Sequence, residues 1–192
     1  MKKMSVHPIV VAAERIVEHL KRLNRPVVGL LRSGISIKTN EVSPWQLTEE
    51  IVALYQWRDG TASQGQILDD MHFFPGFYFM SFDEALENWR AFQKDKRWLP
   101  NWFPIFANGG GDFYVLPLPE GNAGECEVVG FMLGESDHFV EYSSLTNMFN
   151  TILECYTHEA YFVEAAGYLE VDVEKEHKVS HKLNPQLSRW RG

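Results

Sequence analysis

The chain has 192 residues, of which 45% are hydrophobic and 14% aromatic, and its formal net charge is −8. This length and composition indicate one folded domain with a core of its own, because a disordered chain would be poorer in apolar residues and richer in charge. The acidic balance argues against nucleic acid as a partner, since proteins that bind it carry an excess of Lys and Arg.

Membrane, secretory and disulfide signals are missing from the sequence. No apolar run reaches the roughly 18 residues of a membrane span, so we expect no membrane association. Two lysines near the start are not followed by the apolar stretch of a secretory leader. The two cysteines, Cys126 and Cys155, have neither the number nor the spacing of a disulfide framework or a metal site. These features predict a cytoplasmic protein, and they do not specify its oligomeric state.

Three helices are predicted in the first hundred residues from apolar side chains at helical spacing. The first covers residues 9–23. The second follows Ser43, which forms a capping-box pattern with Gln46, and it ends near Gly60 as a C′ residue. The third opens with a second capping box that begins at Ser81.

After Trp102 the apolar period changes from helical to strand-like. Short apolar segments at residues 103–107, 113–118, 127–133 and 138–142 are separated by turn residues. Consecutive strands joined by short turns favour an antiparallel meander over βαβ units. A helix from Ser143 or Ser144, an edge strand at residues 168–173 and a loose tail are expected to follow. The sequence therefore predicts a single α+β domain, with a largely antiparallel sheet and flanking helices.

The most distinctive local motif is Gly109-Gly110-Gly111, followed by Asp112. A P-loop would need Lys and Ser or Thr after its glycines, and a dinucleotide-binding loop would open a helix. Here the residues at 113–116 have the pattern of a strand, and a carboxylate would repel phosphate. We therefore interpret the glycines as a hairpin turn that uses positive φ angles.

No catalytic or metal-binding constellation is complete. Asp69, Asp70 and His72 lie close together, and Cys155 with His158 forms a Cys-x-x-His pair, but structural zinc takes four ligands and no second pair matches. There is no Gly-x-Ser-x-Gly nucleophile motif. We predict no catalytic residue, no metal and no cofactor. A small-molecule site formed by the Asp-Asp-His cluster and the glycine loop is the least favoured alternative.

Charge is distributed unevenly along the chain. Residues 101–174 contain 13 of the 26 acidic residues and no Lys or Arg, whereas the first hundred residues have 13 basic against 12 acidic residues. One interpretation is that the acids only keep the folded surface soluble. The other is a negative face that attracts a basic partner. The residues predicted to form this face are Asp112, Glu125, Glu127, Glu135, Asp137 and Glu141.

Three segments together resemble the Smi/Knr family of the SUKH superfamily. Residues 47–61 (LTEEIVALYQWRDGT) are similar to its helix and Asp-Gly turn, residues 77–92 (FYFMSFDEALENWRAF) to its strand and following helix, and residues 101–118 (NWFPIFANGGGDFYVLPL) to its hairpin. The markers of the resemblance, for which we expect structural roles, are Trp57, Gly60, Trp89, Trp102, Pro104, Gly110, Gly111 and Asp112. The run Leu116-Pro117-Leu118-Pro119 departs from the Asp-Leu-Asp-Pro-like run that the family often has there.

The resemblance implies a mixed α+β fold without enzymatic activity. It divides the chain into an N-terminal helix and connector (1–40), a Smi/Knr-like domain (41–166), and an edge strand with a C-terminal tail (167–192). Bacterial members resemble immunity proteins that bind and neutralise a toxin, often a nuclease, and fungal relatives act as regulators or scaffolds. We therefore expect a protein-binding module of the immunity type with a basic toxin as its partner. A constitutive regulatory or scaffold protein with an endogenous partner is the alternative.

Overall fold

The computed structural model describes residues 6–37, 39–121 and 124–191. The α-helices in these ranges are α1 Pro8–Arg22, α2 Val27–Leu30, α3 Glu49–Trp57, α4 Leu68–Met71, α5 Phe82–Phe92, α6 Leu145–Thr157 and α7 Val173–Leu183, and the 3₁₀ helices are η1 Thr39–Val42 and η2 Ser188–Trp190. The strands are β1 Leu31–Ser33, β2 Arg58–Thr61, β3 Tyr78–Phe79, β4 Trp102–Ala107, β5 Phe113–Pro117, β6 Val128–Phe131, β7 Phe139–Tyr142, β8 Tyr161–Val163 and β9 Leu169–Val171. None of the helices in the described ranges has the length and hydropathy needed to cross a membrane.

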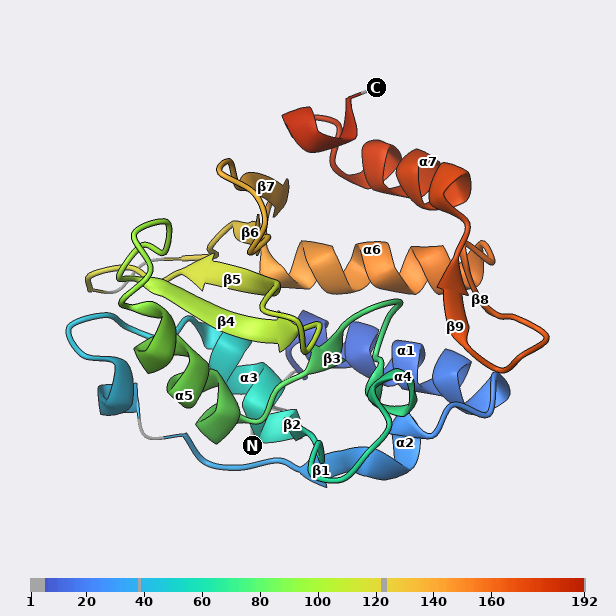
Figure 1. The fold of residues 1–192 in the computed structure, drawn as a ribbon, viewed down its shortest axis with the longest axis horizontal. Coiled ribbons are helices and arrows are strands. Elements are labelled where there is room, and N and C mark those ends of the chain that lie inside the picture. Colours follow the sequence, from blue (N-terminus) through green and yellow to red (C-terminus); the bar gives the residue numbers. More distant parts are fainter. Residues whose placement is uncertain (1–5, 38, 122–123, 192) are drawn as a thin grey trace, which may run out of the picture.

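The central sheet has five strands in the order β3-β4-β5-β6-β7, and each neighbouring pair is antiparallel (Figure 1). From β4 to β7 each strand lies beside the one that precedes it in the chain, whereas β3 is joined to β4 through α5 and the loop that follows it. The predicted antiparallel meander and the α+β class are therefore confirmed. Two further antiparallel pairs, β1 with β2 and β8 with β9, lie outside this sheet.

One face of the sheet is covered by α5 and the segment that follows it. Phe113 of β5 contacts Phe92 at the end of α5, with ring centroids 4.9 Å apart in an edge-to-face arrangement. Trp98, in the loop after α5, lies 5.7 Å from Phe113 and is 4% exposed. Such aromatic contacts add to the free energy of burial, so this loop is part of the core.

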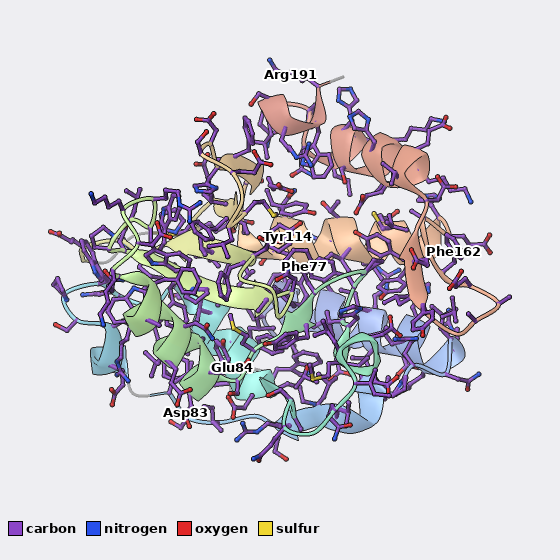
Figure 2. All side chains as sticks on the ribbon, in the orientation of Figure 1. Phe77, Asp83, Glu84, Tyr114, Phe162 and Arg191 are labelled. Carbon is purple, nitrogen blue, oxygen red and sulfur yellow. The ribbon has the colours of Figure 1, made fainter. Side chains whose placement is uncertain are left out.

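The opposite face of the sheet packs against α6 and the loop before β3. Phe106 of β4 and Phe149 of α6 lie 5.9 Å apart and are both fully buried. The rings of Phe77 and Tyr114, labelled in Figure 2, lie 4.7 Å apart on the same side. The sheet is thus enclosed on both faces, as its continuous runs of buried residues require.

The C-terminal segment does not form a loose tail, so that prediction is wrong. Helix α7 packs on the outer side of α6, which lies between α1 and α7 (Figure 1). Asp172 caps α7, since its Oδ1 accepts a hydrogen bond from the Lys175 N–H at 3.1 Å. The contact surface of α7 uses small or polar residues such as Ser180 and Asn184, both fully buried. This is why apolar spacing did not reveal the helix.

The segment after α7 covers the open edge of the sheet. The indole N–H of Trp190 donates to the Glu141 carbonyl oxygen of β7 at 2.6 Å, and its ring lies 6.1 Å from that of Tyr142. An uncovered edge strand exposes unpaired backbone groups to other chains. Trp190 is 6% exposed, so η2 shields β7 and belongs to the folded domain.

The start of α3 also differs from the prediction. The N-cap is Thr48, whose Oγ1 accepts from the Ile51 N–H at 3.4 Å, and the predicted cap Ser43 lies outside the helix. Instead of helix, the segment after Ser43 pairs with the β5–β6 connection, where the Gln46 N–H donates to the Pro119 carbonyl at 3.0 Å. A long-range backbone contact has overridden the local capping signal.

Gly60 lies in β2 and is not the C′ residue of α3. Its φ is +67°, and a Cβ at this position would lie 2.3 Å from the Met80 carbonyl carbon. The neighbouring Asp59 accepts a hydrogen bond from the Phe82 N–H at 2.8 Å, at the start of α5. The Asp-Gly pair therefore fixes β2 against the N-terminus of α5, whose predicted cap Ser81 is confirmed.

The predicted edge strand at residues 168–173 is β9, but it pairs with β8 in a separate hairpin. This hairpin is held by Arg25, whose guanidinium donates to the Gly167 carbonyl at 2.7 Å and to the Asp69 carboxylate at 2.6 Å. The Leu169 N–H donates to the other Asp69 oxygen at 3.2 Å. A buried ion pair thus joins the end of α1, α4 and the β8–β9 hairpin.

Candidate functional site

The acidic residues predicted to form one face are divided between the two ends of the β6–β7 hairpin. Glu125 and Glu127 precede β6 and are exposed. Glu135 and Asp137 are also exposed, but they lie in the turn that joins β6 to β7. Because β6 and β7 are antiparallel, this turn is at the far end of the hairpin.

Asp112 is a structural residue of the β4–β5 turn. Its Oδ2 accepts from the Asn108 side-chain amide at 2.6 Å, and its Oδ1 accepts from the Leu133 N–H at 2.8 Å. Gly109 and Gly111 have φ angles of +76° and +103°, so the hairpin-turn interpretation of the glycines is confirmed. The Asp112 carboxylate ties this turn to the β6–β7 turn.

Arg97, in the loop after α5, places its positive charge against the β6–β7 turn. The Arg97 guanidinium donates to the Leu133 carbonyl and, at 3.3 Å, to the Glu135 carbonyl. Asp95 also pairs with Arg97, at 2.8 Å, and this contact lowers the pKa of Asp95 to about 2. The absence of Lys and Arg from residues 101–174 therefore does not make this end of the hairpin uniformly negative.

Glu141 does not lie on an exposed face, and its inclusion in the predicted set is wrong. Glu141 is only 6% exposed, because its side chain in β7 is directed toward the C-terminal segment. Arg189 lies 3.4 Å from its Oε1. Burial nevertheless raises the pKa of the Glu141 carboxyl above its ordinary value. This carboxylate is part of the contact between β7 and η2.

The other end of the hairpin borders a hollow of about 370 Å³ between the start of α3 and the β5–β6 connection. We call it the acidic hollow; it is lined by His7, residues 46–50, Pro119, Gly121, Gly124 and Glu125. Three of these residues, Glu49, Glu50 and Glu125, are acidic, and none of the described residues that line it is Lys or Arg. Glu49 and Glu125 are exposed at its rim.

Glu50 is buried in the wall of the acidic hollow, with 3% of the residue exposed. Its Oε1 accepts from the Thr146 N–H of α6 at 2.7 Å, beside the N-cap Ser144, whose Oγ accepts from the Asn147 N–H at 3.1 Å. A carboxylate is favoured at a helix N-terminus, where backbone N–H groups lack partners within the helix. Its Oε2 has no hydrogen-bond partner among the described residues.

Three segments that are distant in the sequence line the acidic hollow. Trp45 and Glu120 form an antiparallel bridge that joins the approach to α3 to the β5–β6 connection. His7, the N-cap of α1, accepts from the Ile9 N–H through Nδ1 at 3.3 Å. Glu49 and Glu50 were missed by sequence reasoning, because adjacent acids at a helix start are ordinary there. Long-range contacts, this bridge among them, bring them into the same hollow as Glu125.

The residues of the small-molecule alternative have structural roles. Asp69 is occupied by Arg25 and the β8–β9 hairpin, and burial lowers the pKa of His72. Within the described ranges, no group of three or more His, Cys, Asp or Glu side chains could hold a metal ion. Cys155 is fully buried, which raises its pKa to about 12, whereas His158 is exposed.

The family markers lie in the sheet and in its supporting helices. The Trp57 indole donates to Glu14 of α1 at 2.5 Å, and the Trp89 indole donates to the Pro100 carbonyl at 3.0 Å. The markers in β4 and its following turn are Trp102, Pro104, Gly110, Gly111 and Asp112. Their positions are consistent with the structural roles expected from the sequence.

Comparison with known families gives one match. The sequence model described as "SMI1 / KNR4 family (SUKH-1)" matches residues 40–155. This range contains the whole five-stranded sheet, α3, α5 and most of α6, together with all but one of the residues that line the acidic hollow, His7. Helices α1 and α7 and the β8–β9 hairpin lie outside it. No curated protein matches the chain.

Proposed function

The chain belongs to the SMI1 / KNR4 family (SUKH-1), and on this premise we propose that it is a non-catalytic, immunity-type protein that binds and neutralises a basic toxin in the cytoplasm. The observation that carries this proposal is the acidic hollow. It combines a buried carboxylate, Glu50, with exposed carboxylates at the rim. The partner class is a protein with a positive surface, such as a nuclease.

Charge complementarity supplies the physical argument. A nuclease needs a positive surface to hold nucleic acid, so a negative surface that covers it is attracted before contact is made. Glu49, Glu125 and Glu127 are exposed on or next to the hollow. Such a cluster raises association rates by about 10- to 1,000-fold at low salt, and the effect declines as salt screens the charges.

The proposed division of the chain separates a shared family scaffold from segments added before and after it. Residues 41–166 would carry the family scaffold, and the segments before and after it would add surface that differs from one member to another. Both added segments pack on the domain, through α1 and α7 against α6. We therefore propose that they adapt the scaffold to its own partner.

The alternative function is a regulatory or scaffold protein with an endogenous partner. A second groove, of about 580 Å³, favours this alternative because its walls are largely apolar. Ile67, Leu68 and Tyr168 border it and are 68%, 42% and 53% exposed. Exposed apolar groups that gather on one surface are typical of protein–protein contacts. This groove would bind a partner through apolar contacts, and charge would not select that partner.

Co-expression with a toxin distinguishes the two functions. The toxin encoded beside this gene is expressed in a host cell, with the chain or with its Glu49→Lys, Glu125→Lys, Glu127→Lys variant. The chain should restore growth, and the variant should not. A control with the same change in charge, Glu87→Lys, Glu164→Lys, Glu170→Lys, alters exposed acids elsewhere and should still restore growth. If no neighbouring gene product is toxic, or if both variants protect equally, the proposal is wrong.

A further inference from the structure

Strand β9 has one edge that does not pair with β8, and the register of the β8–β9 hairpin shows which backbone groups lie on it. The Asp172 N–H donates to the Ala160 carbonyl at 2.7 Å, so these two residues form a hydrogen-bonded pair. Hydrogen-bonded and non-hydrogen-bonded pairs alternate along an antiparallel ladder. Val171 and Leu169, one and three residues before Asp172, are therefore in non-hydrogen-bonded pairs, and their N–H and C=O groups point away from β8.

One of these outward groups has a partner. The Leu169 N–H donates to Oδ1 of Asp69 at 3.2 Å, which shows that this edge of β9 faces the start of α4. The Leu169 carbonyl and both backbone groups of Val171 have no hydrogen-bond partner among the described residues. Val171 is partly exposed. An edge with free N–H and C=O groups is a template on which another strand can pair.

The groove of about 580 Å³ described above lies along this edge, beside α4 (Figure 1). We call it the β9 groove; residues 168–171 form one side, and Ile67, Leu68, Asp69, His72, Pro75 and Gly76 line the rest. Ile67 and Leu68 are 68% and 42% exposed. A strand added to the β9 edge would cover both side chains, so pairing of the backbone and burial of apolar surface would occur together.

The charge beside the groove indicates the composition of such a strand. Side chains alternate between the two faces of β9, so Leu169 is buried whereas Tyr168 and Glu170 are exposed on the outer face. None of the described residues that line the groove is Lys or Arg. Opposite charges on neighbouring strands stabilise pairing, and like charges oppose it. The matching strand therefore carries a basic residue on its outer face.

We propose that the β9 groove binds an extended segment of a partner protein, which adds a strand to the edge of β9. Its apolar side chains pack on Ile67 and Leu68, and a Lys or Arg between them lies on the side of Glu170. The β9 groove and the acidic hollow share no lining residue, so this inference goes beyond the proposed toxin contact and assigns the groove to a second protein. Arg25 holds the hairpin in place before binding, which reduces the entropy lost on association.

A short model peptide tests the inference without the partner. Acetyl-Val-Lys-Val-Lys-Val-amide is titrated into the ¹⁵N-labelled chain, and the Val171 amide is followed. In the free chain this amide should exchange with solvent much faster than that of Glu170, which pairs with β8. The peptide should shift the Val171 resonance saturably and slow its exchange. No response of Val171, or a response only at Val163 on the opposite edge of the hairpin, would refute the proposal.

A protected Val171 amide in the free chain would also overturn the proposal, because the edge would then be filled already, by a second copy or by another segment of this chain.

Variants of the peptide test the backbone pairing and the charge. One version is N-methylated on its three valines and the other on its two lysines. Because only one edge of an extended peptide can meet β9, one version should lose binding and the other should keep it; equal binding of the two would rule out an added strand. Acetyl-Val-Glu-Val-Glu-Val-amide should bind more weakly than the lysine peptide, and equal affinity would contradict the assigned charge.

Substitution of Ile67 tests the apolar wall. Ile67 is the N-cap of α4 and makes no capping hydrogen bond, so Ile67→Ser introduces a residue that is favoured there and should not unfold the chain. It should raise the dissociation constant of the lysine peptide by about fivefold or more through lost apolar contact. The control is Leu99→Ser, since Leu99 is 51% exposed and lies outside the groove. Equal effects of the two substitutions would contradict the proposal.

The outcomes separate this inference from the proposed function. If the peptide pairs with β9 but the chain protects against no toxin, the added strand stands and the immunity function is wrong. If the chain protects and no peptide reaches Val171, the function stands and the added strand is refuted.

Discussion

The ion pair between Arg25 and Asp69 should be the costliest polar contact to break. Their side chains are 3% and 16% exposed, and Nη2 and Oδ2 lie 2.6 Å apart. Asp69→Ala would leave the Arg25 guanidinium buried without its carboxylate and the Leu169 N–H without its acceptor. Removing one partner of a buried pair typically costs about 3–5 kcal/mol. Because Asp69 keeps some contact with solvent, we expect a loss of about 3 kcal/mol in the free energy of unfolding.

Equilibrium urea unfolding, followed by tryptophan fluorescence, measures this loss. An exposed pair provides the matched control: Arg90 and Glu41 lie 3.5 Å apart with side chains 56% and 39% exposed. Glu41→Ala should therefore cost less than about 1 kcal/mol. The reasoning is refuted if Asp69→Ala unfolds within about 1 kcal/mol of the unaltered chain at an unchanged m-value, because the pair would then contribute no more than a surface contact.

Three further predictions concern the backbone, the C-terminus and pH. Gly60→Ala should destabilise the chain several times more than Gly65→Ala in the same urea assay. Both glycines have positive φ, but a Cβ would lie within 2.3 Å of other backbone atoms only at Gly60. Equal losses of stability would contradict this. Trp190→Ala should cost about 3–5 kcal/mol, from lost burial, and should promote self-association through the β7 edge, as size-exclusion chromatography would detect; a stable monomer would argue against the edge contact. Burial lowers the pKa of His72 in the folded state, so its stabilising contribution is complete above the unfolded pKa of about 6.5 and is lost as pH falls below it. His72→Gln should flatten this loss of stability between about pH 8 and pH 5, and an unchanged pH profile would show that His72 contributes nothing to it.

The sheet and two of its helices were predictable because their signals are local. The four strand segments after Trp102 are short and apolar and have turn residues between them. The caps of α5 and α6, Ser81 and Ser144, precede clear apolar stripes, and both act as predicted. Short loops then favour pairing between strands that are neighbours in the chain.

The acidic hollow was not predictable, because long-range contacts create it. The bridge between Trp45 and Glu120 joins residues far apart in sequence and displaces the start of α3 from the predicted cap. It also brings Glu50 beside Glu125. A sequence shows that acids are concentrated in a region, but the pleat and the tertiary pairing decide which of them reach the surface. Glu141 is the clearest case, since it is buried beneath η2.

Association kinetics with a basic toxin test the central claim most directly. The rate constant for binding is measured by stopped flow from about 50 to 300 mM salt, a range in which screening of surface charges changes strongly. The chain should bind fast at low salt and progressively more slowly as salt rises. The Glu49→Lys, Glu125→Lys, Glu127→Lys variant should bind more slowly with a flatter salt dependence, whereas the Glu87→Lys, Glu164→Lys, Glu170→Lys control should keep most of the original dependence. Identical kinetics for the two variants would contradict a binding site at the acidic hollow.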